Sequence, residues 1–161
     1  MRELNVKEIT AAVAKLCCDA CYYLPQDLLE KFKASRDTEE SPLGREVLET
    51  IIENAELAAR KDVPLCQDTG LAVVFLEIGQ EVHFTGGALE EAVNAGVAEG
   101  YTKGYLRKSS VDDPLFKRKN TQDNTPAIIH TRLVPGDKVK ITVAPKGCGS
   151  ENMGAMKMLK P

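Results

Sequence analysis

The sequence predicts an α+β fold, in which N-terminal helices pack on a mixed, largely antiparallel sheet. Three observations support this prediction. Apolar residues recur with a helical period over residues 5–22 and again over 42–60. A continuous apolar run at 71–79 is typical of a buried strand, and residues 138–144 alternate between apolar and polar as in a half-buried strand. The 161 residues are enough for one domain with its own core.

The first 60 residues are expected to form three helices, which span residues 5–22, 26–34 and 42–60. Ser41 is a suitable N-cap for the third helix, and Pro42 suits its first position, where no backbone N–H is needed. Three apolar side chains of the second helix are expected to face inward: Leu28, Leu29 and Phe32.

The apolar run 71–79 is expected to be buried on both faces, with residues 80–84 pairing back on it as a short strand. A fourth helix is predicted from residue 88 to at least 101. Glycines recur every fourth residue along and just beyond it, which indicates a close approach of another backbone: Gly96, Gly100 and Gly104.

Residues 127–134 and 138–144 are expected to form a hairpin around Pro135-Gly136-Asp137. His130 lies in the first of these strands, and we interpret it as structural. The polar residues 112–124 have no periodicity and are read as a loop over the functional site.

Composition excludes several classes of function. A net charge of −3 without a basic stripe gives no basis for nucleic-acid binding, and no apolar run approaches the ~20 residues of a membrane span. The first residues lack the pattern of a signal peptide. We therefore expect a cytoplasmic protein, whose five cysteines are thiols or metal ligands instead of disulfides.

Three of these cysteines lie at the end of the first predicted helix: Cys17, Cys18 and Cys21. The C-x-x-C spacing suggests a metal or redox site. The alternative, which we favour, is that they pack as small buried side chains, because the neighbouring sequence lacks a second ligand pair to complete a tetrahedral site.

The segment Cys66-Gln67-Asp68-Thr69-Gly70 has the strongest chemical character in the chain. It places a soft metal ligand, an amide, a carboxylate and a hydroxyl on consecutive positions between a helix and a strand. Loops held by a rigid scaffold often carry such chemistry. A second polar loop, Lys146-Gly147-Cys148-Gly149-Ser150-Glu151-Asn152, is predicted to lead from a strand into a helix, and its glycines allow backbone N–H groups to approach a carboxylate.

These two loops, together with Arg118-Lys119-Asn120-Thr121-Gln122-Asp123-Asn124-Thr125-Pro126-Ala127, resemble the iron–sulfur hydro-lyases, which comprise the class I fumarate hydratases and the related L(+)-tartrate dehydratases. The resemblance covers essentially the whole chain. It corresponds to the N-terminal part of the α subunit, or of the fused single chain.

The resemblance implies a role for each matching residue. Cys66 would be one of three cysteine ligands of a [4Fe-4S] cluster, and Gln67 would contact the substrate. Asp68 would also bind substrate and handle a proton at the departing or arriving water, although a carboxylate after a metal ligand can instead orient that ligand. Arg107 would hold a substrate carboxylate through its planar guanidinium. The second loop would contribute further substrate-binding residues: Lys146, Gly147, Gly149 and Ser150.

The resemblance also implies that this chain is an N-terminal fragment and a single domain. Two more cluster cysteines would lie further along the α sequence, so Cys148 is expected not to be a ligand. A β subunit or C-terminal domain would complete the site, and we expect an oligomer.

The implied reaction is the reversible hydration of fumarate to (S)-malate, with a dicarboxylic acid as substrate. Dehydration of L(+)-tartrate by the same machinery is the alternative, and the form of the second loop favours fumarate. A different class of function also stays open, in which the cysteines bind metal in a non-catalytic metal-binding or assembly module.

Overall fold

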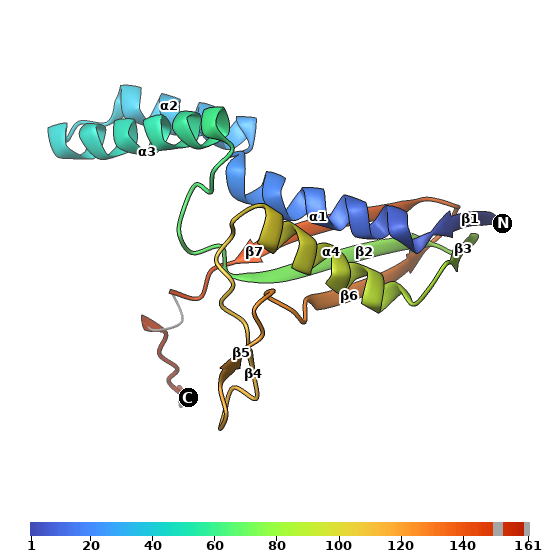
Figure 1. Ribbon diagram of the computed structural model, residues 1–161. Coiled ribbons are helices and arrows are strands. Elements are labelled where there is room, and N and C mark those ends of the chain that lie inside the picture. The colour runs from blue at the N-terminus through green and yellow to red at the C-terminus, as the bar shows by residue number, and fades with distance from the viewer. Residues whose placement is uncertain (150–152, 160–161) are drawn as a thin grey trace.

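The computed structural model describes residues 1–149 and 153–159, which form an α+β structure as predicted (Figure 1). The helices are α1 (Val6–Tyr22), α2 (Gln26–Thr38), α3 (Pro42–Lys61) and α4 (Leu89–Lys103). The strands are β1 (Arg2–Asn5), β2 (Leu71–Gly79), β3 (Val82–Thr85), β4 (Val111–Asp112), β5 (Lys119–Asn120), β6 (Ile128–Val134) and β7 (Val139–Lys146).

The main sheet has three strands in the order β6-β2-β7. It is mixed, as predicted, but β2 pairs parallel with β6 and antiparallel with β7, so neither direction predominates. The predicted hairpin between β6 and β7 is therefore wrong, because β2 lies between them. Their connection crosses the end of β2 at Gly79, where a Cβ atom would lie 2.3 Å from the Gly136 carbonyl oxygen. A glycine at this position lets the connection pass.

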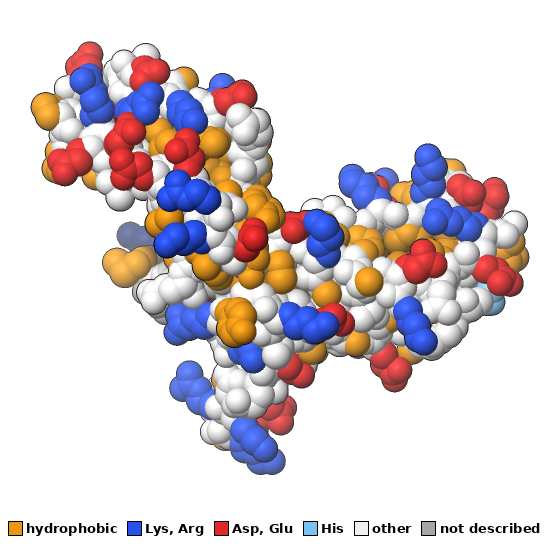
Figure 2. Space-filling model, turned by 45° about the horizontal axis from the view of Figure 1, so that its top comes forward, with side chains coloured by type: hydrophobic (Ala, Val, Ile, Leu, Met, Phe, Trp, Pro, Cys, Tyr) orange, Lys and Arg blue, Asp and Glu red, His pale blue; other side chains and the backbone are white. Residues whose placement is uncertain are grey.

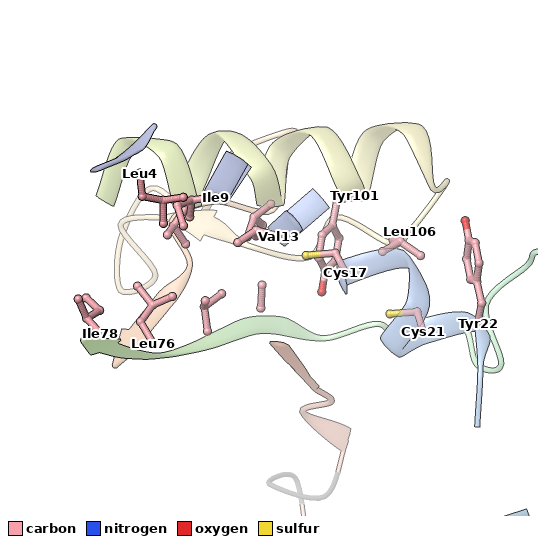
Figure 3. Close-up of a cluster of buried hydrophobic side chains, with 14 residues drawn as sticks. Leu4, Ile9, Val13, Cys17, Cys21, Tyr22, Leu76, Ile78, Tyr101 and Leu106 are labelled. Carbon is pink, nitrogen blue, oxygen red and sulfur yellow. The ribbon is translucent and has the colours of Figure 1, made fainter. Parts of the chain in front are cut away.

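One face of the sheet forms the core with α1 and α4 (Figure 3). Alternate side chains of β2 point into it and are buried: Ala72, Val74, Leu76 and Ile78. The prediction that β2 is buried on both faces is wrong, because Phe75 on the other face is 44% exposed. Phe75 stacks on His130 of β6, with ring centroids 5.1 Å apart, which agrees with a structural role for this histidine.

The glycine repeat of α4 lies against α1, as the spacing predicted. A Cβ atom on Gly96 would lie 2.7 Å from the Thr10 carbonyl oxygen, and one on Gly104 would lie 2.6 Å from the Cys18 sulfur. The two helices can approach this closely only because these positions lack side chains. Cys17 and Cys21 face the same core and are buried, as the packing interpretation predicted.

The second and third helices do not join the layer on the sheet, although we expected all the N-terminal helices there. In Figure 1, α2 and α3 form a pair that projects away from the sheet beyond the end of α1. Ser41 caps α3 as predicted, and its hydroxyl accepts the Gly44 amide at 3.2 Å. Of the three α2 side chains expected to face inward, Leu28 is 46% exposed, so that part of the prediction is wrong.

Two further strand pairs flank the sheet. β1 pairs parallel with β3, so the prediction that residues 80–84 pair back on β2 is wrong. β4 and β5 form a small antiparallel projection within the segment predicted as a loop, and exposed Lys and Arg side chains gather on this projection (Figure 2).

Residues 154–159 have no regular secondary structure, where we predicted the first turns of a helix. Within the part of the chain that the structure describes, no helix is long and apolar enough to cross a membrane.

Candidate functional site

The loop that contains Cys66 is held against the ends of α1 and α3. Asp62 ends α3 in the left-handed conformation, with φ 50°. The side-chain amide of Asn54 donates to the Leu65 carbonyl oxygen at 2.9 Å, and the Leu65 amide donates to the Cys21 carbonyl oxygen at 2.9 Å. The loop backbone is thus fixed while the Cys66 side chain stays exposed.

The sheet brings the two polar loops of the sequence together. The start of β2 pairs antiparallel with the end of β7, with Leu71 opposite Lys146. Gly70 precedes this pair with φ 61°, and a Cβ atom there would lie 2.1 Å from the Lys146 carbonyl oxygen. The segments 66–70 and 146–149 therefore lie in direct backbone contact, although about 80 residues separate them.

Asp68 links the two loops through its carboxylate. One oxygen accepts the Gly70 amide at 3.2 Å, and the other accepts the Cys148 amide at 3.3 Å. The second oxygen also faces Gly147, where a Cβ atom would lie only 3.1 Å away. The Asp68 amide points at the Cys66 sulfur, with a nitrogen–sulfur distance of 3.4 Å. An N–H donor at this place suits a thiolate, the form in which cysteine binds a metal.

Arg107 is brought to the same end of the sheet through its backbone. The Thr69 hydroxyl donates to the Arg107 carbonyl oxygen at 3.1 Å, and the Tyr101 hydroxyl at the end of α4 donates to the Thr69 carbonyl oxygen at 2.8 Å. Burial raises the pKa of Tyr101 above its ordinary value, so this hydroxyl keeps its proton as a donor. The Arg107 side chain is exposed and accessible to an anion.

The other predicted site residues lie on the same two loops. Gln67 is exposed beside the metal-ligand candidate. Lys146 and Gly149 are also exposed, and the Lys146 ammonium donates to the Gly147 carbonyl oxygen. Ser150 lies outside the described residues.

Asn124 is a residue of the site region that sequence reasoning did not single out. It has no exposed surface, and its side-chain nitrogen donates to the Gly70 carbonyl oxygen at 3.0 Å. Its side-chain oxygen accepts the Ser109 amide at 2.8 Å and the Ser110 amide at 3.0 Å. The sequence pattern gives no sign that Asn124 is buried, because the polar segment around it has no periodicity.

The described residues beside Cys66 enclose only a small pocket. A pocket of about 120 Å³ lies beside the loop, lined by Ala20, Cys21, Leu65, Cys66, Asp68, Thr69 and Pro145. This volume is well below the ~300–1,000 Å³ typical of small-molecule sites. A hollow of about 810 Å³ lies elsewhere, between the β4–β5 projection and α4, and Cys66 does not line it.

Cys66 fits one position of an iron–sulfur cluster, since it is exposed and its sulfur accepts an N–H group. The described residues do not supply the remaining ligands: among them, no three His, Cys, Asp or Glu side chains are arranged to hold a metal ion. Burial raises the pKa of Cys17 to about 12 and that of Cys21 to about 11, which agrees with their packing as neutral thiols in the core.

The paired loops, the segment that carries Arg107 and the exposed Cys66 lie at one end of the sheet. Comparison with known proteins identifies the family. Residues 10–161 match the family model described as fumarate hydratase (Fumerase). Since the match covers most of the chain, the protein belongs to the fumarate hydratase (Fumerase) family, as the motifs predicted.

Three relatives illustrate the family. The chain is 36% identical over 159 residues to a Methanocaldococcus jannaschii protein named "Putative L(+)-tartrate dehydratase subunit alpha", covering 96% of this chain and 55% of the relative. It is 34% identical over 152 residues to fumarate hydratase 2 of Leishmania major, covering 93% and 27%. It is 28% identical over 162 residues to the L(+)-tartrate dehydratase subunit alpha of Escherichia coli (strain K12), covering 99% and 53%. The chain thus spans about half the length of the two tartrate dehydratase subunits and about a quarter of the Leishmania enzyme.

Proposed function

We propose that this chain is the N-terminal portion and a single domain of the catalytic α subunit of a hydro-lyase that interconverts fumarate and (S)-malate. One observation supports this most directly. The sheet places the Cys66–Gly70 loop in backbone contact with the Lys146–Gly149 loop, and Thr69 ties the Arg107 segment to the first of them. A metal-ligand candidate and a carboxylate thereby lie at one end of β2, next to the backbone of Arg107.

The residues of this chain would bind and orient the substrate. The exposed guanidinium of Arg107 would pair with one substrate carboxylate through two parallel hydrogen bonds. Backbone N–H groups around Gly147 and Gly149, with Lys146 and Ser150, would stabilise the charge that develops as the substrate loses a proton. Gln67, beside Cys66, would contact the substrate as well.

Asp68 is proposed to bind substrate and to exchange a proton with the departing or arriving water. Two backbone amides hold its carboxylate in place, so it needs little reorganisation when a proton moves. The alternative is that Asp68 only orients Cys66 and the neighbouring loop, a role its contacts also permit.

Cys66 would be one of three cysteine ligands of a [4Fe-4S] cluster, with the others supplied by residues beyond this chain. When bound, a cluster with one open iron supplies a Lewis acid for the substrate hydroxyl. A β subunit or C-terminal domain is proposed to complete the site within an oligomer. All five cysteines are free thiols, which agrees with a reducing compartment such as the cytoplasm.

Dehydration of L(+)-tartrate is the second candidate, because relatives at 36% and 28% identity carry that name. We favour fumarate on the Lys146–Asn152 sequence. Both substrates are four-carbon dicarboxylic acids, so the contacts described above would serve either.

The test uses the complete α chain with its partner, reconstituted with iron and sulfide without oxygen. Wild type, Cys66→Ser and Cys148→Ser are assayed on fumarate and L(+)-tartrate, with iron and sulfide measured in each. We expect Cys66→Ser to lose both the cluster and the hydration of fumarate. Cys148→Ser, a matched change of an exposed cysteine in the adjacent loop, should keep the cluster.

Activity on tartrate alone would correct the substrate. An intact cluster with full activity in Cys66→Ser would refute the ligand assignment. A wild-type protein that holds zinc and acts on neither substrate would favour a non-catalytic module.

A further inference from the structure

The segment that carries Arg107 has no ladder of its own to fix it near the Cys66 loop. Residues 106–110 follow the end of α4 without regular secondary structure. On one side, the Asn120 side-chain amide donates to the Lys108 carbonyl oxygen at 2.8 Å, which ties the segment to β5. Its connection to the Cys66 loop is made by side chains of Thr69 and Asn124.

Both side chains join the end of the Cys66 loop, at residues 69–70, to the Arg107 segment, at residues 107–110. Thr69, 3% exposed, donates its hydroxyl directly to the Arg107 carbonyl oxygen. Asn124, 0% exposed, bonds on one side to the Gly70 carbonyl and on the other to the Ser109 and Ser110 amides. We call Thr69 and Asn124 the clasp.

The chemistry of Asn124 is specific to an amide. Its oxygen accepts two backbone amides and the Ser110 hydroxyl, the last at 3.1 Å, while its nitrogen donates to a carbonyl. An ionised carboxylate has no donor and would place negative charge against the Gly70 carbonyl oxygen. A buried polar side chain is stable only when its groups are paired, so this geometry is tightly constrained.

We propose that Thr69 and Asn124 are positioning residues that fix the spacing between the Cys66–Asp68 end of the site and Arg107, and thereby set the length of dicarboxylic acid that binds. This inference rests on the proposed function, since it takes Arg107 as the group that holds a substrate carboxylate. A substrate held at both ends is sensitive to the distance between the two points of attachment. A shift of about 1 Å in such a site can lower the rate by about 100-fold.

The experiment uses the complete enzyme with its partner, reconstituted as above. It compares wild type with Asn124→Asp and Thr69→Val, the second of which removes the hydroxyl at nearly constant volume. Asn94→Asp is the matched control. The Asn94 amide also both donates and accepts, to Glu90 and from Ala127, and neither of these two bonds involves the Cys66 loop or the Arg107 segment.

The readouts are KM and kcat for fumarate, inhibition constants for malonate, succinate and glutarate, iron content, and melting temperature. We expect the clasp variants to raise KM by about ten-fold or more, as for the loss of one buried hydrogen bond. The preference for succinate over its shorter and longer homologues should fall by a similar factor. Iron content should stay at the wild-type value, and Asn94→Asp should keep both KM and length preference.

A purely structural role would lower the amount of active enzyme without changing KM or length preference. Folded, iron-loaded clasp variants with wild-type values of both would overturn the proposal. If Asn124→Asp does not fold, Thr69→Val decides, with Thr69→Ser expected to restore the wild-type KM. Failure of both clasp variants to fold would assign these residues a structural role instead. A wild-type enzyme inactive on both substrates would overturn the proposed function, and the clasp proposal with it.

Discussion

Replacing Gly70 by alanine tests whether backbone contact between β2 and β7 holds the two loops of the site together. Gly70 has φ 61°, a left-handed conformation that costs a residue with a side chain about 1–2 kcal/mol. Its new Cβ would lie 2.1 Å from the Lys146 carbonyl oxygen and 2.6 Å from the Gly147 nitrogen. Both are backbone atoms, so no side chain can turn aside.

The contact can be relieved only if the strands separate by about 1.5 Å at this end, because non-bonded heavy atoms prefer about 3.5–4.0 Å. Overpacking of this kind costs about 1–3 kcal/mol. Together with the conformational term, Gly70→Ala should lower the free energy of unfolding by about 2–5 kcal/mol. For a protein of this size, that corresponds to a melting temperature lower by roughly 5–15 °C.

Urea unfolding followed by circular dichroism measures the change, and Gly136→Ala is the control. Gly136 has φ 100°, but among the described residues no atom lies within 4 Å of a Cβ built there. Its substitution carries only the backbone strain, about 1–3 kcal/mol. Gly70→Ala should therefore exceed it by about 1–2 kcal/mol. Equal losses in the two variants would show that the Lys146 carbonyl does not restrict this position, and the contact between the loops would have to be revised.

Two more predictions concern the helical layer. Gly100→Ala should destabilise the protein by about 1–3 kcal/mol, because its Cβ would lie 2.7 Å from a carbonyl oxygen of α1 and 2.9 Å from the Cys17 Cβ. Gly44→Ala in α3 meets only a flexible side chain and should be neutral or stabilising, so the opposite order in urea unfolding would contradict the helix contact. The second prediction follows from the raised pKa values of Cys17 and Cys21, whose ordinary value is 9.0. The folded state holds these protons more tightly, so their contribution is fully present below pH 9 and is lost as pH rises towards 11–12. It should fall by on the order of 2 kcal/mol for each thiol by about pH 10.5, and Cys17→Ala should flatten this slope in unfolding measured against pH. An unchanged slope in that variant would contradict it.

The sequence predicted individual elements better than their partners. Periodicity identified α1, α3 and α4, and the glycine spacing indicated that another backbone approaches α4 closely, without indicating that this is α1. The sequence did not indicate that β2 lies between β6 and β7. An alternating pattern shows which face of a strand is exposed to solvent, but not which strand pairs with it. The short β1 was missed for a related reason: four residues are too few for a period, and its pairing with β3 depends on tertiary structure.

The helix pair α2–α3 shows the limit of an amphipathic pattern. Leu28 and Leu43 belong to apolar stripes that suggest burial, yet they are 46% and 70% exposed. An apolar stripe shows that a helix has an apolar face. The position of the α2–α3 pair in the molecule depends instead on the connection at residues 22–26 and on the element that packs against that face. Arg36 pairs with Glu49 across the two helices at 2.9 Å, an interaction that no local pattern indicates.

The candidate site was predictable to the extent that its chemistry lies within short motifs. Cys66 and Asp68 lie in one short segment and Gly147 and Gly149 in another, and the residue types within each segment suggest ligand binding. The neighbours that hold them are not adjacent. Asn124 lies 54 residues from the Gly70 carbonyl to which it donates, and no property of its own segment marks it as buried.

The Cys66 and Lys146 loops are therefore held by a different kind of interaction from the Arg107 segment. The two parts of the candidate site should respond differently to single substitutions. The Cys66 and Lys146 loops are joined by a strand pairing that continues along β2 and β7, so many backbone hydrogen bonds together keep the two loops in place. The Arg107 segment is joined to the Cys66 loop by side-chain bonds from Thr69 and Asn124, while its two ends are held by the buried Leu106 and by the Thr121 amide, which donates to the Ser110 carbonyl oxygen. Single substitutions in the clasp should thus move Arg107 relative to Cys66 without unfolding the sheet. In such a protein, substrate affinity can change while the strand framework that positions Cys66 and Asp68 is kept.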